Sequence, residues 1–167
     1  VLKHIDNVEE YNKEIIAYLV NISSKEISIH DENKVSALHT VVNDLIRESE
    51  IADNVVKYTR FVIEKDIDFS EHVYQSIREL RNLLSEQFNN VEKILIEKDY
   101  SVLDKVIEIE DKIDNMRTEL IDGHIKRLEE GKCKPQSSGV FINLISNLER
   151  AGDHLNYIVD VWSNKGK

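Results

Sequence analysis

The chain has 167 residues, of which 41% are hydrophobic and 32% are charged, so it holds enough apolar material for one folded core. Its net charge of -10 argues against nucleic acid or an anionic membrane surface as a partner. Five glycines and one proline leave few turns, which argues for long uninterrupted elements and against an all-β sandwich or barrel. The single cysteine, Cys133, excludes an internal disulfide and fits a reducing, cytoplasmic setting.

Apolar residues recur at intervals of three and four along five segments, which predicts five long amphipathic helices. Their expected ranges are 3–22, 32–65, 71–98, 102–130 and 136–164. Short connections make successive helices antiparallel. We therefore predict an all-α fold, an elongated antiparallel helical bundle that forms a single domain over residues 1–167.

Polar and special residues at the expected breaks support these boundaries. Asp31, Ser70 and Ser101 are predicted N-caps, because their side chains accept hydrogen bonds from first-turn amides. Gly131 is predicted to close the fourth helix, and Pro135 to lie in the first turn of the fifth.

Two parts of the chain resemble each other and predict an internal repeat. The tripeptide Ile-Asp-Asn occurs at 5–7 and again at 113–115, and a later Asp stands in similar settings within 51–54 and 151–154. Self-similarity of this kind indicates duplicated helical units. We expect repeat one to span about 1–98 and repeat two, truncated, about 101–167.

Four acidic residues form the best candidate site. Glu110 and Asp114 are four positions apart on one predicted helix, and Glu149 and Asp153 are four apart on another. Residues at this spacing share a helix face, and both pairs flank the apolar stripe, where two packed helices meet. Converging carboxylates repel unless a proton or cation intervenes. We therefore predict a metal site of oxygen ligands for magnesium, calcium, manganese, iron or zinc.

A simpler interpretation remains open for these acids. Arg150, Lys112 and Arg117 are close enough in sequence to pair with them as ordinary surface salt bridges. Among other reactive residues, His124 is predicted to be a core histidine and His154 to lie on a solvated face. No nucleophile, base and oxyanion hole occur together, so we predict that the protein is not an enzyme.

The segment 147–158, which reads Asn-Leu-Glu-Arg-Ala-Gly-Asp-His-Leu-Asn-Tyr-Ile, resembles the signature of the PhoU family of phosphate-uptake regulators. Residues 109–114 resemble that family's E-x-x-I-D helix. The segments 124–128 and 131–135 are similar to the turn in PhoU-like domains of certain sodium/phosphate cotransporters, and 15–23 with 41–45 echo the first copy.

The resemblance implies a helical regulator of phosphate transport that binds metal through acidic helix motifs. It implies one complete site, at Glu110, Asp114, Glu149 and Asp153, and a weaker, degraded first-repeat site. In the first copy Asp6 and Asp53 are kept, but Leu2 and Ser49 stand where acids are expected, and Glu50 is a partial substitute. The sixth family helix is absent and the chain begins at Val1, so we expect a piece of a longer protein.

These features favour a regulatory, metal-binding module at the cytosolic face of the inner membrane. Its expected partners are a membrane transporter domain in the same chain or complex and further copies of itself, with no nucleic acid. Two alternatives stay open. One is a structural or oligomerising bundle without metal, and the other is a carboxylate-metal phosphohydrolase, which needs an open coordination position and a general base.

Overall fold

The computed structural model describes residues 1–133 and 135–166; Lys134, within the turn noted above, and Lys167 lie outside them. Five long helices account for most of the chain, and the described residues contain no strand, which confirms the all-α prediction. In order they are α1 (Leu2–Ser23), α2 (Ile29–Glu64), α3 (Glu71–Glu92), α4 (Leu103–Glu129) and α5 (Pro135–Lys165). A π-helical turn, Lys93–Glu97, extends α3, and a 3-10 turn, Tyr100–Val102, leads into α4.

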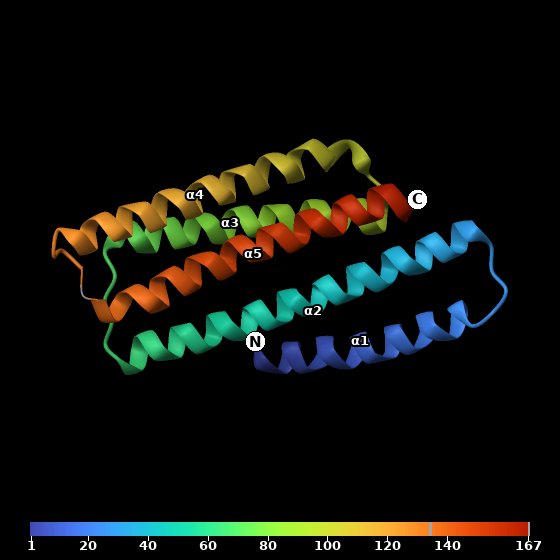
Figure 1. The fold of residues 1–167 in the computed structure, drawn as a ribbon, viewed down its shortest axis with the longest axis horizontal. Helices are drawn as coiled ribbons and strands as arrows, with labels where there is room; N and C mark the ends of the chain where they lie inside the picture. Colours follow the sequence, from blue (N-terminus) through green and yellow to red (C-terminus); the bar gives the residue numbers. More distant parts are fainter. Residues whose placement is uncertain (134, 167) are drawn as a thin grey trace.

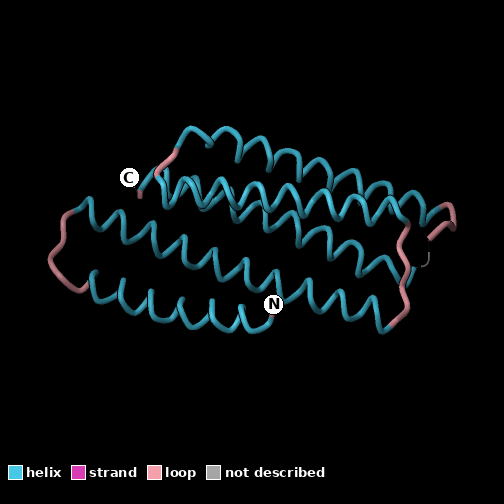
Figure 2. The backbone as a smooth tube through the Cα atoms, turned by 180° about the vertical axis from the view of Figure 1, so that it is seen from behind, coloured by secondary structure: helices cyan, strands magenta, loops and turns pink. Residues whose placement is uncertain are grey.

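The helices lie side by side along the long axis of the molecule, and successive helices run antiparallel (Figures 1 and 2). Helices α3, α4 and α5 pack against one another as a three-helix group, and α2 packs along the other side of α5. Helix α1 packs against α2 and covers only part of its length (Figure 1). Helix α5 therefore lies at the centre, between α2 and the α3–α4 pair.

Two buried apolar clusters hold the three-helix group together. One cluster consists of residues from the N-terminal half of α3, from α4 and from the first half of α5, and it includes Leu80, Ile109, Ile113, Phe141 and Ile145. The other lies toward the end of α5 and also draws on α2 and on the π-helical turn; its members are Val41, Val91, Ile94, Val106, Leu155, Ile158 and Val159. Burial of such side chains stabilises a fold by about 1.5–3 kcal/mol each. The apolar stripes of the fourth and fifth helices thus face the core, as their spacing predicts.

Helix α1 is much less buried. Leu19 is its one buried residue among those described, while Tyr11, Ile15 and Tyr18 are exposed. In the described part of the chain, no helix has both the length and the apolar character needed to cross a membrane.

The helix ends differ in part from the predicted caps. Ser70 caps α3 as predicted, since its hydroxyl accepts from the Val73 N–H. The prediction that Asp31 caps the second helix is wrong: Ser28 is the cap, and its Oγ accepts from the Asp31 N–H at 3.2 Å, so α2 begins three residues early. Ser101 is not the cap of α4 either; Asp99 accepts from the Ser101 N–H at 3.0 Å and caps the 3-10 turn instead. At the start of α2 and at the turn before α4, two nearby polar side chains can each serve as the N-cap, and spacing in the sequence does not decide between them.

Gly152 brings α5 close to α3 and α4. It is buried, and a Cβ at this position would lie 3.3 Å from Ile113 Cδ1 and 3.4 Å from Gln87 Oε1. The fully buried Gln87 donates from Nε2 to the Gly152 carbonyl at 3.0 Å, which ties α3 to α5. The glycine is therefore required by packing.

Gly152→Val is expected to destabilise the protein by about 1–3 kcal/mol, because the added methyl groups overpack the contact with Ile113 and Gln87. Gly139→Ala is the matched control on the same helix, where an added Cβ meets no atom within 4 Å. It is expected to raise the free energy of unfolding by up to about 1 kcal/mol, since alanine lowers the entropy of the unfolded chain. Urea denaturation of both variants measures the effects, and equal behaviour of the two would contradict the packing role of Gly152.

Candidate metal centre

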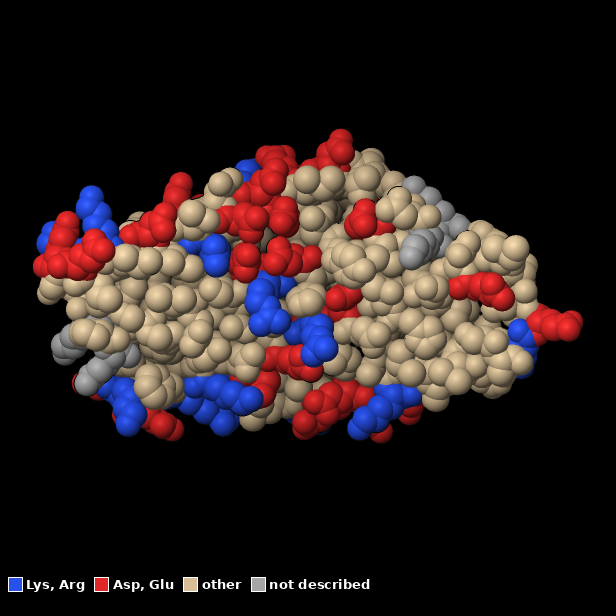
Figure 3. Space-filling model, viewed as in Figure 1, with Lys and Arg blue, Asp and Glu red and all other residues tan. Residues whose placement is uncertain are grey.

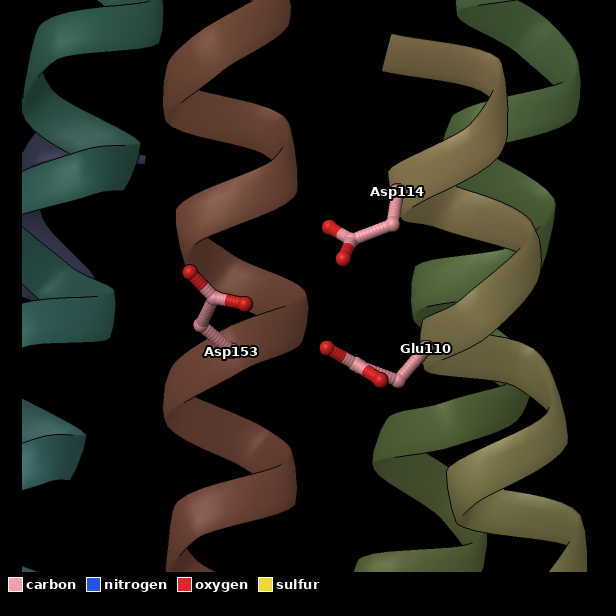
Figure 4. A group of neighbouring side chains, drawn as sticks. All are labelled: Glu110, Asp114 and Asp153. Atoms are coloured by element: carbon pink, nitrogen blue, oxygen red, sulfur yellow. The ribbon is translucent and has the colours of Figure 1, made fainter. Parts of the chain in front are cut away.

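Three carboxylates from two helices meet at the seam between α4 and α5. Glu110 and Asp114 project from α4 and Asp153 from α5, and Figure 4 shows the three side chains pointing toward one another across the gap between the ribbons. One oxygen from each lies within 4.8 Å of the others. Glu110 is half-buried and the two aspartates are exposed. The geometry arises because i, i+4 spacing aligns the α4 pair on one face, and α5 packs antiparallel beside it.

The fourth predicted ligand, Glu149, is half-buried one turn before Asp153 but lies outside this close group. Its carboxyl is still affected by the negative charge of the cluster. Burial and, after it, the charge of Asp153 raise the pKa of the Glu149 carboxyl, while Arg117 opposes that rise. Glu149 therefore borders the site, and its role as a ligand stays a prediction.

Crowding of negative charge makes ionisation of the cluster unfavourable. The pKa of Glu110 is raised by burial first and then by Asp114 and Asp153. The pKa of Asp153 is likewise raised, by burial and by Asp114, with smaller opposing effects of His154 and Arg150. The same face carries a concentration of Asp and Glu side chains over α4 (Figure 3). A cation at the seam would relieve this repulsion.

Basic side chains near the cluster offset its negative charge only from beyond salt-bridge distance. Lys112 pairs with Glu108 at 2.7 Å, on α4 but outside the cluster. Within the described ranges, neither Arg117 nor Arg150 has a nitrogen within salt-bridge distance of a carboxylate, and Arg117 Nε is buried without a partner. Ordinary surface salt bridges therefore do not account for these acids.

The donor set of this group fits a hard cation. All three residues offer carboxylate oxygens, which magnesium, calcium and manganese prefer, and none offers a nitrogen or sulfur ligand. Partial burial of the Glu110 carboxyl lowers its solvation and strengthens its attraction for a cation.

The first-repeat acids are arranged differently. Glu50 pairs with Arg47 at 2.8 Å, and Asp53 pairs with Lys57 at 2.6 Å, both within α2. Asp6 is exposed on α1. Among the described residues, Asp6, Glu50 and Asp53 do not form a close carboxylate group like the one between α4 and α5. The charges of Glu50 and Asp53 are instead balanced by basic neighbours on α2.

A second polar group at the seam between α2 and α5 was not predicted. His154 Nδ1 lies 2.9 Å from Asp44 Oδ1, and both residues are largely shielded from solvent. The prediction of a solvated His154 is therefore wrong, because α2 packs over the side of α5 opposite α4. Nearby, Glu48 Oε1 is buried with no hydrogen-bond partner among the described residues, and burial, followed by the charge of Asp44, raises the pKa of Glu48 to about 8.

His124 is buried, as the sequence predicts. Its Nε2 lies 2.9 Å from Ser138 Oγ, and its ring lies 4.6 Å from that of Phe141, centroid to centroid. Burial, and then the charge of Arg127, lower its pKa. It joins α4 to the start of α5 and is distant from the carboxylate cluster along α4.

Fold and site together define a class of all-α bundle proteins that carry clustered carboxylates on paired helices. A model of the PhoU domain family matches residues 77–161, which include α4, most of α5 and all four predicted ligands of the second repeat. The chain belongs to the PhoU family. It is 24% identical over 173 aligned positions to the "Phosphate-specific transport system accessory protein PhoU homolog 1" of Thermotoga maritima, covering all of this chain and 72% of that protein. No solved structure matches.

Glu48→Gln is expected to make stability less dependent on pH. Because the folded-state pKa of about 8 lies above the unfolded value of about 4.3, the parent is stabilised at low pH and loses this contribution as pH rises toward 8. The neutral variant avoids the loss and is expected to exceed the parent by about 1–3 kcal/mol above pH 8, with little difference near pH 4. Denaturation across this range tests it, with Glu50→Gln as the exposed control; parallel curves for parent and Glu48→Gln would refute it.

In metal-free buffer at pH 7, Asp153→Asn is expected to raise the free energy of unfolding by about 0.5 kcal/mol, a value that allows for solvent screening. The raised pKa values mean that the folded state binds protons more tightly than the unfolded chain. The protonated Glu110 and Asp153 carboxyls therefore stabilise the fold at low pH. This stabilisation is lost as the pH rises through their raised pKa values.

The control for this prediction is Glu108→Gln. Lys112 lowers the pKa of Glu108, first through a hydrogen bond and then through its charge, so removal of this carboxylate is expected to have the opposite sign. Chemical denaturation in EDTA measures both variants. A loss of stability in Asp153→Asn would show that the carboxylates do not repel.

Proposed function

We propose that this protein is a regulatory accessory component of phosphate transport that holds a divalent cation between α4 and α5. The convergence of Glu110, Asp114 and Asp153 carries the metal part of the proposal. Membership of the PhoU family, and likeness to a protein described as an accessory of a phosphate-specific transport system, support the regulatory part.

The three converging carboxylates would hold the cation, and Glu149 would add charge at the border. When bound, the ion supplies two positive charges where three to four negative ones gather. Helix α4 presents two ligands from one face, and α5 presents the third. A bound ion would therefore link the two helices. A ligand that binds one packing of the helices better than another shifts the population toward it.

The same proposal places the protein at the cytosolic face of a membrane, with a transporter as its partner. The likeness of 124–128 and 131–135 to the corresponding turn in sodium/phosphate cotransporter domains supports a partner of that kind. Exposed apolar side chains on α1, among them Tyr11, Ile15 and Tyr18, supply a surface for contact with a transporter or with another copy of the chain.

Titration with manganese, magnesium or calcium after EDTA treatment is expected to stabilise the parent, by about 2.7 kcal/mol at one hundred times the dissociation constant. Glu110→Gln and Asp153→Asn are expected to lose this stabilisation, because each removes one of three converging oxygens. Glu108→Gln, on the same helix but outside the cluster, is the matched control and should respond like the parent. Thermal denaturation measures the stabilisation, and equilibrium dialysis measures metal binding. Equal stabilisation and equal binding in the parent and all variants would contradict the proposed metal site.

The regulatory role is tested in cells that lack the gene. Restoring the parent gene is expected to restore the normal change of phosphate uptake with external phosphate, whereas Asp153→Asn restores it incompletely and Glu108→Gln fully. Purified protein is also assayed for phosphate-ester hydrolysis with manganese. Unchanged uptake control without the gene, or metal-dependent hydrolysis by the parent that Asp153→Asn lacks, would contradict a regulatory, non-catalytic role.

A further inference from the structure

A cavity of about 330 Å³ lies at the end of the bundle where α2 joins α3 and α4 joins α5. Its walls are the 65–70 connection, the last turns of α4, the turn that follows α4 and the start of α5. Arg127, on its wall, is thirteen residues beyond Asp114 on α4, which corresponds to roughly 20 Å along the helix. The cavity is therefore separate from the carboxylate cluster.

Basic side chains gather around this cavity although the chain is acidic overall. Lys65, Arg127 and Lys132 line it, together with the acids Asp66 and Asp68. Lys132 pairs with Glu130 at 2.8 Å at the surface. Lys65 and Arg127 have no ion-pair partner in the structure of residues 1–133 and 135–166, so neither aspartate on the wall is in direct contact with their charges.

Arg127 is held in an unusual state for a guanidinium. Its Nη2 is buried and has no hydrogen-bond acceptor among the described residues, and its Nη1 would lie 3.2 Å from a Cβ at Gly123, one turn earlier on α4. The missing side chain at Gly123 therefore leaves the space in which the guanidinium lies against its own helix. A covered charged donor without an acceptor is costly, and an anion that draws the group into the cavity would satisfy it.

The remaining walls suit a small ligand with a charged end. Phe69 and Val73 give an apolar side, and the Ser70 hydroxyl and the His124 ring lie near the basic residues. The volume exceeds that needed by one inorganic anion and leaves room for a small organic group. The partly positive N-termini of α3 and α5 and the partly negative C-termini of α2 and α4 meet at this cavity. The side-chain charges therefore decide whether the cavity prefers an anion or a cation.

We propose that this cavity binds a phosphate-type oxyanion, either free phosphate or the phosphate group of a small monoester, with Arg127 as its principal ligand and Lys65 and Lys132 in support. Arginine is suited to this role, because its planar fork donates two parallel hydrogen bonds to phosphate oxygens. The proposal rests on the cavity alone and holds whether or not the α4–α5 seam binds metal.

Calorimetric titration of the EDTA-treated protein with inorganic phosphate, and separately with adenosine monophosphate, tests the proposal at constant ionic strength. The parent is expected to bind at least one of the two saturably. Tighter binding of the monoester identifies an organic phosphate as the natural source, and tighter binding of phosphate identifies the free ion. Arg127→Gln is expected to weaken binding on the order of tenfold or more.

Arg47→Gln is the matched control, because it also removes one arginine but lies in the middle of α2, paired with Glu50. It should bind like the parent. Arg127→Lys keeps the charge but loses the fork, and is expected to show intermediate affinity. If Arg127→Gln fails to fold by circular dichroism, Lys65→Gln takes its place, with a smaller expected loss.

The single cysteine supplies a local readout, since Cys133 lines the cavity. The bound anion is expected to slow alkylation of the Cys133 thiol by iodoacetamide in the parent and not in Arg127→Gln. No saturable binding by the parent, equal losses in Arg47→Gln and Arg127→Gln, or binding that leaves Cys133 reactivity unchanged would each overturn the proposal.

Discussion

The antiparallel packing of α5 between α2 and the α3–α4 pair is the constraint on which the rest of the structure depends. The apolar stripe of α5 fills both buried clusters, and Gly152 lets the helix approach Ile113 and Gln87 closely. Once this stripe is fixed against α3 and α4, the rotation of α5 about its axis is fixed too. Asp153 must then face α4 at the level of Glu110 and Asp114. The acidic seam is thus a result of how the core packs.

The seam also shows how a stable core can carry an unfavourable surface feature. Apolar burial contributes far more to stability than a few like charges at a half-exposed border remove. The carboxylates can therefore remain close together at a modest cost. All three of these carboxylates lie within the part of the chain that matches the PhoU domain.

Much of the fold could be predicted from sequence, because helical periodicity, few breakers and short connections all indicate the same bundle. The pairs Glu110–Asp114 and Glu149–Asp153 were also visible, since i, i+4 spacing depends on one helix alone. Which side chains meet across helices could be predicted only in part: Glu110, Asp114 and Asp153 converge as expected, but other contacts do not follow from spacing along one helix. Glu149 falls outside the closest group, and His154 pairs with Asp44 rather than with water, because both outcomes depend on the exact rotation and neighbours of α5. The Asp31 and Ser101 caps failed for a local reason: Ser28, three residues before Asp31, caps α2, and Asp99, two residues before Ser101, caps the 3-10 turn that leads into α4.

Two neighbouring residues on α5 look in different directions. Successive residues on an α-helix are about 100° apart, so Asp153 faces α4 while His154 reaches Asp44 on α2. A small roll of α5 that opened or closed the carboxylate group would also lengthen or shorten the bond to Asp44. The helix pair α1–α2 and the carboxylate seam are therefore linked through α5, so a rotation of this helix would change the contacts on both of its sides.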